Sequence, residues 1–208
     1  MKLLPDNPLG RFFLLGLLWL PVWFSVWYAM APLLSAPSTW LASLVLNVFH
    51  PGLINDIERS GNIATFVTGL QITVPGGPEG AIGQVVLDKN PLIYSWNLPV
   101  LVALLFATGE RLLSFNKLLL VYLLLLPFHA WGVGFDLLKT LTLDTGPEIA
   151  GQLGYSGWSL EFIGLAYQFG YLMLPVIGAT SIWVAMNREL IESMLRPAPG
   201  KEAGGGVS

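Results

Sequence analysis

Apolar residues in this chain are gathered into long runs that short polar segments separate. Runs of this kind predict membrane-spanning helices, because an α-helix needs about 20 apolar residues to cross a bilayer. The sequence therefore predicts an all-α integral membrane protein, a helical bundle with four spans in a single membrane domain. The predicted spans are about 12–34, 91–108, 117–138 and 158–185.

A further apolar run, residues 37–49, is shorter than the others. As a helix its 13 residues reach about 20 Å, less than the hydrocarbon thickness of about 30 Å. We expect an interfacial helix here, lying in the membrane interface or dipping into it, with Trp40 as an anchor. A true membrane span is the alternative.

This run opens an insertion, residues 37–90, whose second part has the pattern of a small water-exposed β-structure. Apolar and polar residues alternate from Phe66 to Val74, with the period of a half-buried strand. A turn rich in Gly and Pro follows, and residues 81–87 form a returning strand. We expect a small outer β-hairpin that rests on the interfacial helix, the membrane surface or a partner.

Composition agrees with a membrane protein: 54% of the residues are hydrophobic and only 11% are charged. The net charge of −3, with no basic block, argues against nucleic acid as a partner. The chain has no cysteine, which excludes disulfides, thiolate metal sites and a cysteine nucleophile.

Basic residues predict the orientation of the four spans. With the N-terminus inside, the three outer basic residues are Arg59, Lys89 and Lys139, and the remaining seven of ten are inside. We therefore expect both termini on the cytoplasmic side, with residues 197–208 as a flexible tail.

Polar residues and glycines form one stripe on each of the last two spans, with helical spacing. A histidine or a carboxylate is costly in hydrocarbon, so we expect the two stripes to face each other inside the bundle. This polar network of a helix pair, or partner contact, is the candidate site. Its members are His129, Gly132, Asp136 and Lys139 on one span, and Glu161, Gly164, Gln168 and Tyr171 on the other.

An antiparallel arrangement of these spans sets which groups meet. His129 falls at the level of Gln168, so we expect those two side chains to pair. Lys139 and Glu161 could form an ion pair with each other, or each side chain could extend separately to water, and the sequence leaves both alternatives open. His129 and Asp136 lie about 10 Å apart along their helix, too far for a catalytic dyad. We expect no metal site, because no second histidine lies near His129.

Four segments carry a resemblance to a known family. They are LWLPVWFSVWY (Leu18–Tyr28), NPLIYSWNLP (Asn90–Pro99), WGVGFDLLKTL (Trp131–Leu141) and YQFGYLMLP (Tyr167–Pro175). In this order they resemble exosortase H-associated membrane proteins, small bacterial inner-membrane proteins that accompany a membrane-embedded sorting protease. The resemblance implies an inner-membrane accessory subunit for C-terminal sorting of exported proteins, with lipid and the protease as partners. It implies no cofactor and no catalytic residues.

Three function classes are therefore considered, and a non-catalytic accessory subunit is preferred. A small intramembrane enzyme that uses Asp136, Glu161 and His129 is the first alternative, and a transporter component is the second. The sequence contains no nucleophile elbow, phosphate-binding loop or zinc-protease motif. It also shows no internal duplication of the kind found in many transporters.

Overall fold

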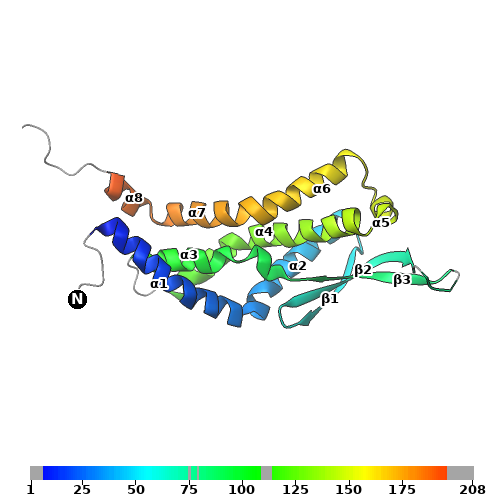
Figure 1. Cartoon of the computed structure of the whole chain (residues 1–208), viewed down its shortest axis with the longest axis horizontal. Coiled ribbons are helices and arrows are strands. Elements are labelled where there is room, and N and C mark those ends of the chain that lie inside the picture. Colours follow the sequence, from blue (N-terminus) through cyan, green and yellow to red (C-terminus); the bar gives the residue numbers. More distant parts are fainter. Residues whose placement is uncertain (1–6, 75, 79, 109–113, 196–208) are drawn as a thin grey trace, which may run out of the picture.

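A computed structural model describes residues 7–74, 76–78, 80–108 and 114–195 as an elongated array of helices with a small sheet toward one end (Figure 1). The helices are α1 (Pro8–Ala29), α2 (Ala31–Phe49), α3 (Asn97–Ala107), α4 (Phe115–Lys139), α5 (Pro147–Gln152), α6 (Trp158–Gln168), α7 (Leu174–Met186) and α8 (Arg188–Leu195). The strands are β1 (Ile54–Ser60), β2 (Ile63–Thr73) and β3 (Ile82–Lys89). Three short turns complete the elements: a 3₁₀ turn η1 (Pro91–Tyr94) and two π-helical turns, η2 (Thr140–Asp144) and η3 (Phe169–Met173).

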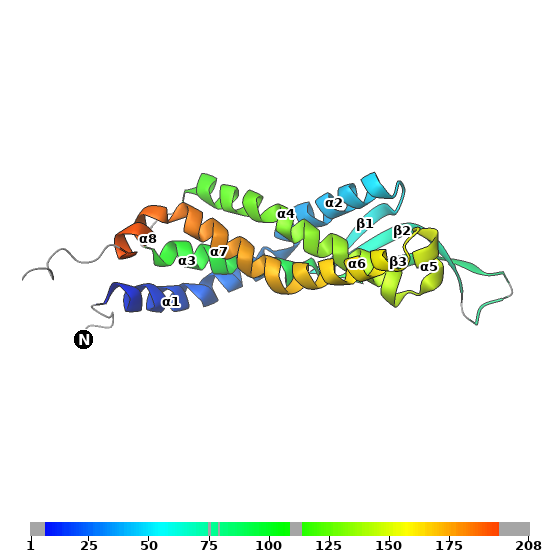
Figure 2. The ribbon, with the colours of Figure 1, turned by 90° about the horizontal axis from the view of Figure 1, so that it is seen from above.

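Two long rods run side by side along the molecule (Figures 1 and 2). One is α4 with η2, and the other is α6, η3 and α7. Helices α1 and α2 follow one another along the length of the molecule with a bend between them, and they pack against α3 and α4 respectively (Figure 1). The start of α1 and the end of α8 lie at the end of the array opposite the sheet (Figure 1). The two described ends of the chain therefore lie at the same end of the array, and the side of a membrane that they face stays a prediction.

Within the described residues, four helices are long and apolar enough to cross a membrane: Leu9–Ala29, Ala31–Phe49, Phe115–Asp144 and Trp158–Met186. The last two confirm the predicted spans 117–138 and 158–185 as long apolar helices. The predicted bounds 12–34 and 37–49 are wrong, because the chain bends at Met30 and α2 then includes both 31–34 and the predicted short helix.

The proline pattern explains this break. Pro32 lies in the first turn of α2, where a proline needs no N–H and its fixed φ suits the helix. Pro37 is tolerated inside the same helix. The predicted span 91–108 is also divided, into η1 and the 11 residues of α3. Asn90 caps the start of this segment, and its side chain accepts a hydrogen bond from the Leu92 N–H at 3.1 Å.

The sheet has three antiparallel strands in the order β1-β2-β3. The predicted hairpin is confirmed as β2 and β3, but the prediction missed β1. Its signal was present in the sequence: Gly61-Asn62 is a two-residue turn between Ser60 and Ile63, which are paired across the strands. Gly61 has a φ of 58°, a conformation that glycine adopts without strain.

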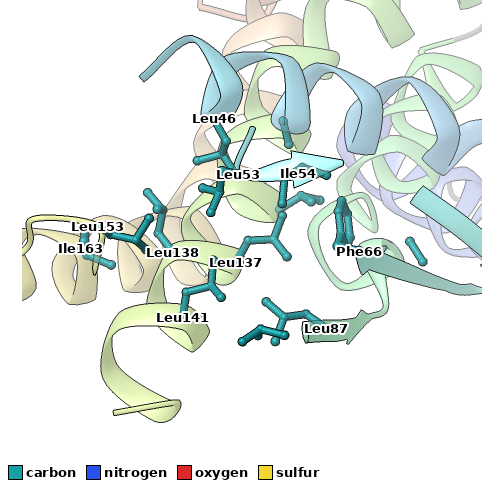
Figure 3. Close-up of a cluster of buried hydrophobic side chains, with 14 of the residues drawn as sticks. Leu46, Leu53, Ile54, Phe66, Leu87, Leu137, Leu138, Leu141, Leu153 and Ile163 are labelled. Atoms are coloured by element: carbon teal, nitrogen blue, oxygen red, sulfur yellow. The ribbon is translucent and has the colours of Figure 1, made fainter. Parts of the chain in front are cut away.

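A buried hydrophobic cluster joins the sheet to the helices (Figure 3). Side chains from all three strands meet side chains from α2, α4, η2 and α6. The labelled members are Leu46, Leu53, Ile54, Phe66, Leu87, Leu137, Leu138, Leu141, Leu153 and Ile163. Since a short sheet is marginal by itself, burial against these helices is what stabilises it.

Polar contacts fix β1 to α2 as well. The Arg59 guanidinium donates to Ser35 Oγ at 3.2 Å, to the Ala36 carbonyl at 3.3 Å and to Thr39 Oγ1. Ser35 and Thr39 are buried, and burial lowers the pKa of Arg59 from its usual value. Helix α2 therefore supports the sheet, which is one of the three supports left open by the sequence. The interfacial location expected for 37–49 stays a prediction, because α2 is also long and apolar enough to cross a membrane.

Candidate functional site

A buried ion pair lies where the sheet meets the helices. The Nζ atom of Lys89, the last residue of β3, donates to Asp136 Oδ1 at 2.8 Å and to Thr140 Oγ1 at 2.5 Å. The Lys89 and Asp136 side chains are only 15% and 10% exposed. Lys89 alternates with Val85 and Leu87 on the buried face of β3, so the strand itself directs the ammonium toward α4.

Tyrosines from three elements gather beside this ion pair. Tyr94 of η1 is buried, and its hydroxyl is near enough to Asp136 and Tyr167 to interact electrostatically, although it has no hydrogen-bond partner among the described residues. Its ring meets Tyr171 edge-on at 6.3 Å, and Tyr171 stacks with Tyr167 at 6.1 Å. We name Lys89, Asp136, Thr140, Tyr94, Tyr167 and Tyr171 together the clamp cluster.

Lys139 borders the clamp cluster on its exposed side. Its Nζ atom lies 5.6 Å from the centre of the Tyr167 ring, a cation–π distance. The same Nζ donates to Asp144 Oδ2 at 2.6 Å. Of the two alternatives left open for Lys139 and Glu161, the ion pair between them is therefore not formed. The π-helical turn η2, which follows Lys139 directly, returns Asp144 toward it, whereas Glu161 lies exposed on α6.

Two glycines permit the close approach of these elements. A Cβ at Gly132 would lie 2.3 Å from Tyr94 Cδ1, so only glycine leaves room for that ring. A Cβ at Gly170 would lie 2.9 Å from Trp131 Cδ1. The indole Nε1 of Trp131 donates to the Ala166 carbonyl at 3.1 Å, next to the π-helical turn η3. This hydrogen bond joins α4 to the other rod at the point where that rod changes from α-helix to a π-helical turn.

The expected pair of His129 with Gln168 is wrong. His129 is buried, but its Nε2 atom pairs with Asn97 Oδ1 of α3 at 2.7 Å. Gln168 is exposed on α6. Helix α3 packs beside both α4 and α7, and it supplies the partner that was expected from α6.

The two predicted stripes thus converge only in part. Gly132, Asp136 and Tyr171 lie in or against the clamp cluster, and Lys139 lies at its border. Gly164 makes only ordinary contact, since a Cβ there would lie 3.7 Å from Leu143 Cδ1. A role of these residues in contacting a partner stays a prediction.

The three residues considered for an enzyme have separate surroundings. Asp136 is bound to Lys89, His129 is bound to Asn97, and Glu161 is exposed. In the part of the chain that the structure describes, no group of three or more His, Cys, Asp or Glu side chains could hold a metal ion.

Sequence reasoning missed several members of this site: Lys89, Tyr94, Asn97, Thr140 and Tyr167. A signal for Lys89 did exist. A lysine that alternates with apolar residues on the buried face of a strand requires a buried acid as its partner. Asp136 was the acid singled out in the spans, but the pairing depends on where the sheet rests.

Comparison with known proteins gives one finding that covers most of the chain. A family model described as exosortase H-associated membrane protein matches residues 6–190. Neither the curated proteins nor the solved structures give a match. The matched range contains the whole clamp cluster and all three strands.

Proposed function

The chain belongs to the exosortase H-associated membrane protein family, and on that premise we propose that it is a non-catalytic accessory subunit of an exosortase-type sorting system. The observation that supports this role most directly is the Lys89–Asp136 pair. This pair uses a buried carboxylate to join the sheet to the helices. The protein then acts as a scaffold that holds this sheet at a fixed place beside a membrane-embedded protease.

The proposed location is the bacterial inner membrane, with both termini in the cytoplasm. The distribution of basic residues supports this orientation, since only Arg59, Lys89 and Lys139 fall in the segments at the sheet end. The sheet then lies on the outer side, where exported proteins arrive. Exposed apolar side chains along the helices, such as Phe13, Val48 and Phe49, support contact with lipid or with partner helices.

Co-purification tests the accessory role. The tagged chain, extracted in a mild detergent, is expected to retain an exosortase-type protease. Deletion of the chain is expected to leave sorted precursors unprocessed, and the purified chain alone is expected to leave a tripartite sorting tail intact. Cleavage of that tail by the purified chain would show that the subunit is itself catalytic.

Single cysteines test the orientation, because the chain has none of its own. A cysteine at Gly77 or Gly146 is expected to react with an impermeant thiol reagent added to the outer side. A cysteine at Gly204 is expected to stay unlabelled in intact cells. Labelling of Gly204 under those conditions would contradict cytoplasmic termini.

A further inference from the structure

The β3 strand forms one edge of the sheet and is open along its length. In the order β1-β2-β3 it has one neighbouring strand, and among the described elements only β2 packs extensively along it. The hairpin of β2 and β3 extends beyond the helices (Figure 2). An edge strand presents unpaired N–H and C=O groups, which can pair with another extended chain.

One hydrogen bond shows which backbone N–H and C=O groups of β3 point to the open edge. The Val85 carbonyl accepts from Thr68 Oγ1 of β2 at 2.7 Å, so the backbone of Val85 faces β2. Backbone groups alternate along a strand, so those of Gln84, Val86 and Asp88 point to the open edge. The side chains of the same residues are exposed on the open face of the sheet.

The charges on the sheet indicate which kind of extended chain the β3 edge would attract. Its acidic residues Asp56, Glu58 and Asp88 are exposed. Its two basic residues are both engaged, Arg59 with α2 and Lys89 with Asp136. The open face is therefore acidic. Two copies of this sheet would repel each other, whereas a basic segment would be attracted.

We propose that the β3 edge binds an extended, basic segment of an exported polypeptide by strand addition. This proposal rests on the proposed function, because that function places the sheet on the outer side. Strand addition gives affinity through backbone hydrogen bonds and specificity through alternate side chains. The segment pairs an apolar residue with Val86, which is 49% exposed, and a lysine or arginine with Asp88.

Binding is measured by fluorescence anisotropy, using the full chain in detergent and a labelled peptide of alternating valine, threonine and lysine. Two comparison peptides share its length: one has glutamate for lysine, and one is N-methylated at alternate residues. The lysine peptide is expected to bind about tenfold more tightly than the glutamate peptide. N-methylation is expected to abolish binding, which charge attraction alone would not do.

Val86→Pro removes an edge N–H without removing a bond to β2, and Val86→Thr is the matched control that keeps the N–H. The proline variant is expected to weaken peptide binding about tenfold relative to the threonine variant. Asp88→Lys keeps the backbone donor and is expected to reverse the preference toward the glutamate peptide. It tests the same edge if the proline variant fails to fold.

Equal binding of the N-methylated peptide, or no binding of any peptide, would overturn the proposal. A dimer of the chain that Val86→Pro dissociates would also overturn it, since the edge would then pair with a second copy. Co-purification of the protease is measured with the same variants. If the unmodified chain binds no peptide but still co-purifies with the protease, only strand addition is refuted. If the unmodified chain does not co-purify with the protease, the accessory role is refuted.

Discussion

The two buried clusters of this protein are stabilised in different ways. The first joins the sheet, α2, α4 and α6, and the buried Lys89–Asp136 pair lies beside it. The second contains side chains from α1, α3, α4 and α7 and is rich in aromatic rings. In this second cluster, the indole Nε1 atoms of Trp23 and Trp183 are buried without a hydrogen-bond partner among the described residues.

The contrast shows which part of the molecule fixes the position of its elements by specific contacts. In the helix-only cluster, apolar packing is joined by two side-chain hydrogen bonds, from Trp27 Nε1 to Ser95 Oγ at 3.2 Å and from the Tyr122 hydroxyl to the Leu34 carbonyl at 2.9 Å. Small changes of apolar side chain in such packing are often tolerated. At the sheet end, a strand must meet helices at one position, and a buried ion pair and a glycine contact define that position. Substitutions at the sheet end are therefore expected to cost more than substitutions elsewhere.

The largest effect is expected from breaking the ion pair. Asp136→Ala leaves the Lys89 ammonium buried without its partner and is expected to cost about 3–5 kcal/mol of stability. Replacing both residues, as Lys89→Met with Asp136→Leu, is expected to recover much of that loss. The measurement is reversible unfolding in mixed micelles.

The matched control for this prediction is Lys139→Ala. It breaks the more exposed pair with Asp144, whose side chain is 47% exposed, and is expected to cost about 0–1 kcal/mol. Equal losses in Asp136→Ala and Lys139→Ala would remove the distinction between a buried clamp and a surface pair.

The next largest loss of stability is expected when a side chain is added at Gly132. Gly132→Ala places a methyl group 2.3 Å from Tyr94 Cδ1, and this overpacking is expected to cost about 1–3 kcal/mol. Gly164→Ala is the control, because its nearest contact is 3.7 Å away, and it is expected to be neutral or slightly stabilising. Thermal unfolding of the two variants in one detergent compares them. If Gly164→Ala were the more damaging, the close approach at Tyr94 would not be what constrains the helix.

A smaller loss of stability is expected where the end of α2 meets the loop before α6. The Tyr155 hydroxyl lies 2.7 Å from His50 Nε2, so this side chain links the end of α2 to the loop before α6. Partial burial raises the pKa of Tyr155 above its usual value. Tyr155→Phe removes this hydrogen bond and is expected to cost about 1 kcal/mol. Tyr28→Phe, on the exposed surface of α1, is the control and is expected to change stability little. A loss in Tyr28→Phe that equals the loss in Tyr155→Phe would contradict a specific link.

The smallest effect is expected at Gln168. Because this side chain is exposed, Gln168→Leu is expected to change stability by less than about 0.5 kcal/mol. Gly132→Leu is expected to be far more damaging in the same unfolding experiment. The reverse ranking would mean that Gln168 has a structural partner.

Much of the architecture was predictable from the sequence. Long apolar runs predicted the two rods, alternation predicted β2 and β3, and the segments Leu18–Tyr28 and Trp131–Leu141 pointed to the family that the comparison confirms. These features are local or periodic, so the order of residues along the chain contains them. The stripe on α4 likewise identified Asp136 as a buried acid, because an ionised group in an apolar helix is too costly to face lipid.

The partners of these residues were decided only by the tertiary structure. Asp136 meets Lys89 across 47 positions of sequence, and His129 meets Asn97 across 32. No helical or strand period relates such residues, and their distance depends on how α3 packs and where the sheet rests. Helix periodicity shows which face of a helix is buried, but it contains no information on which neighbour buries it.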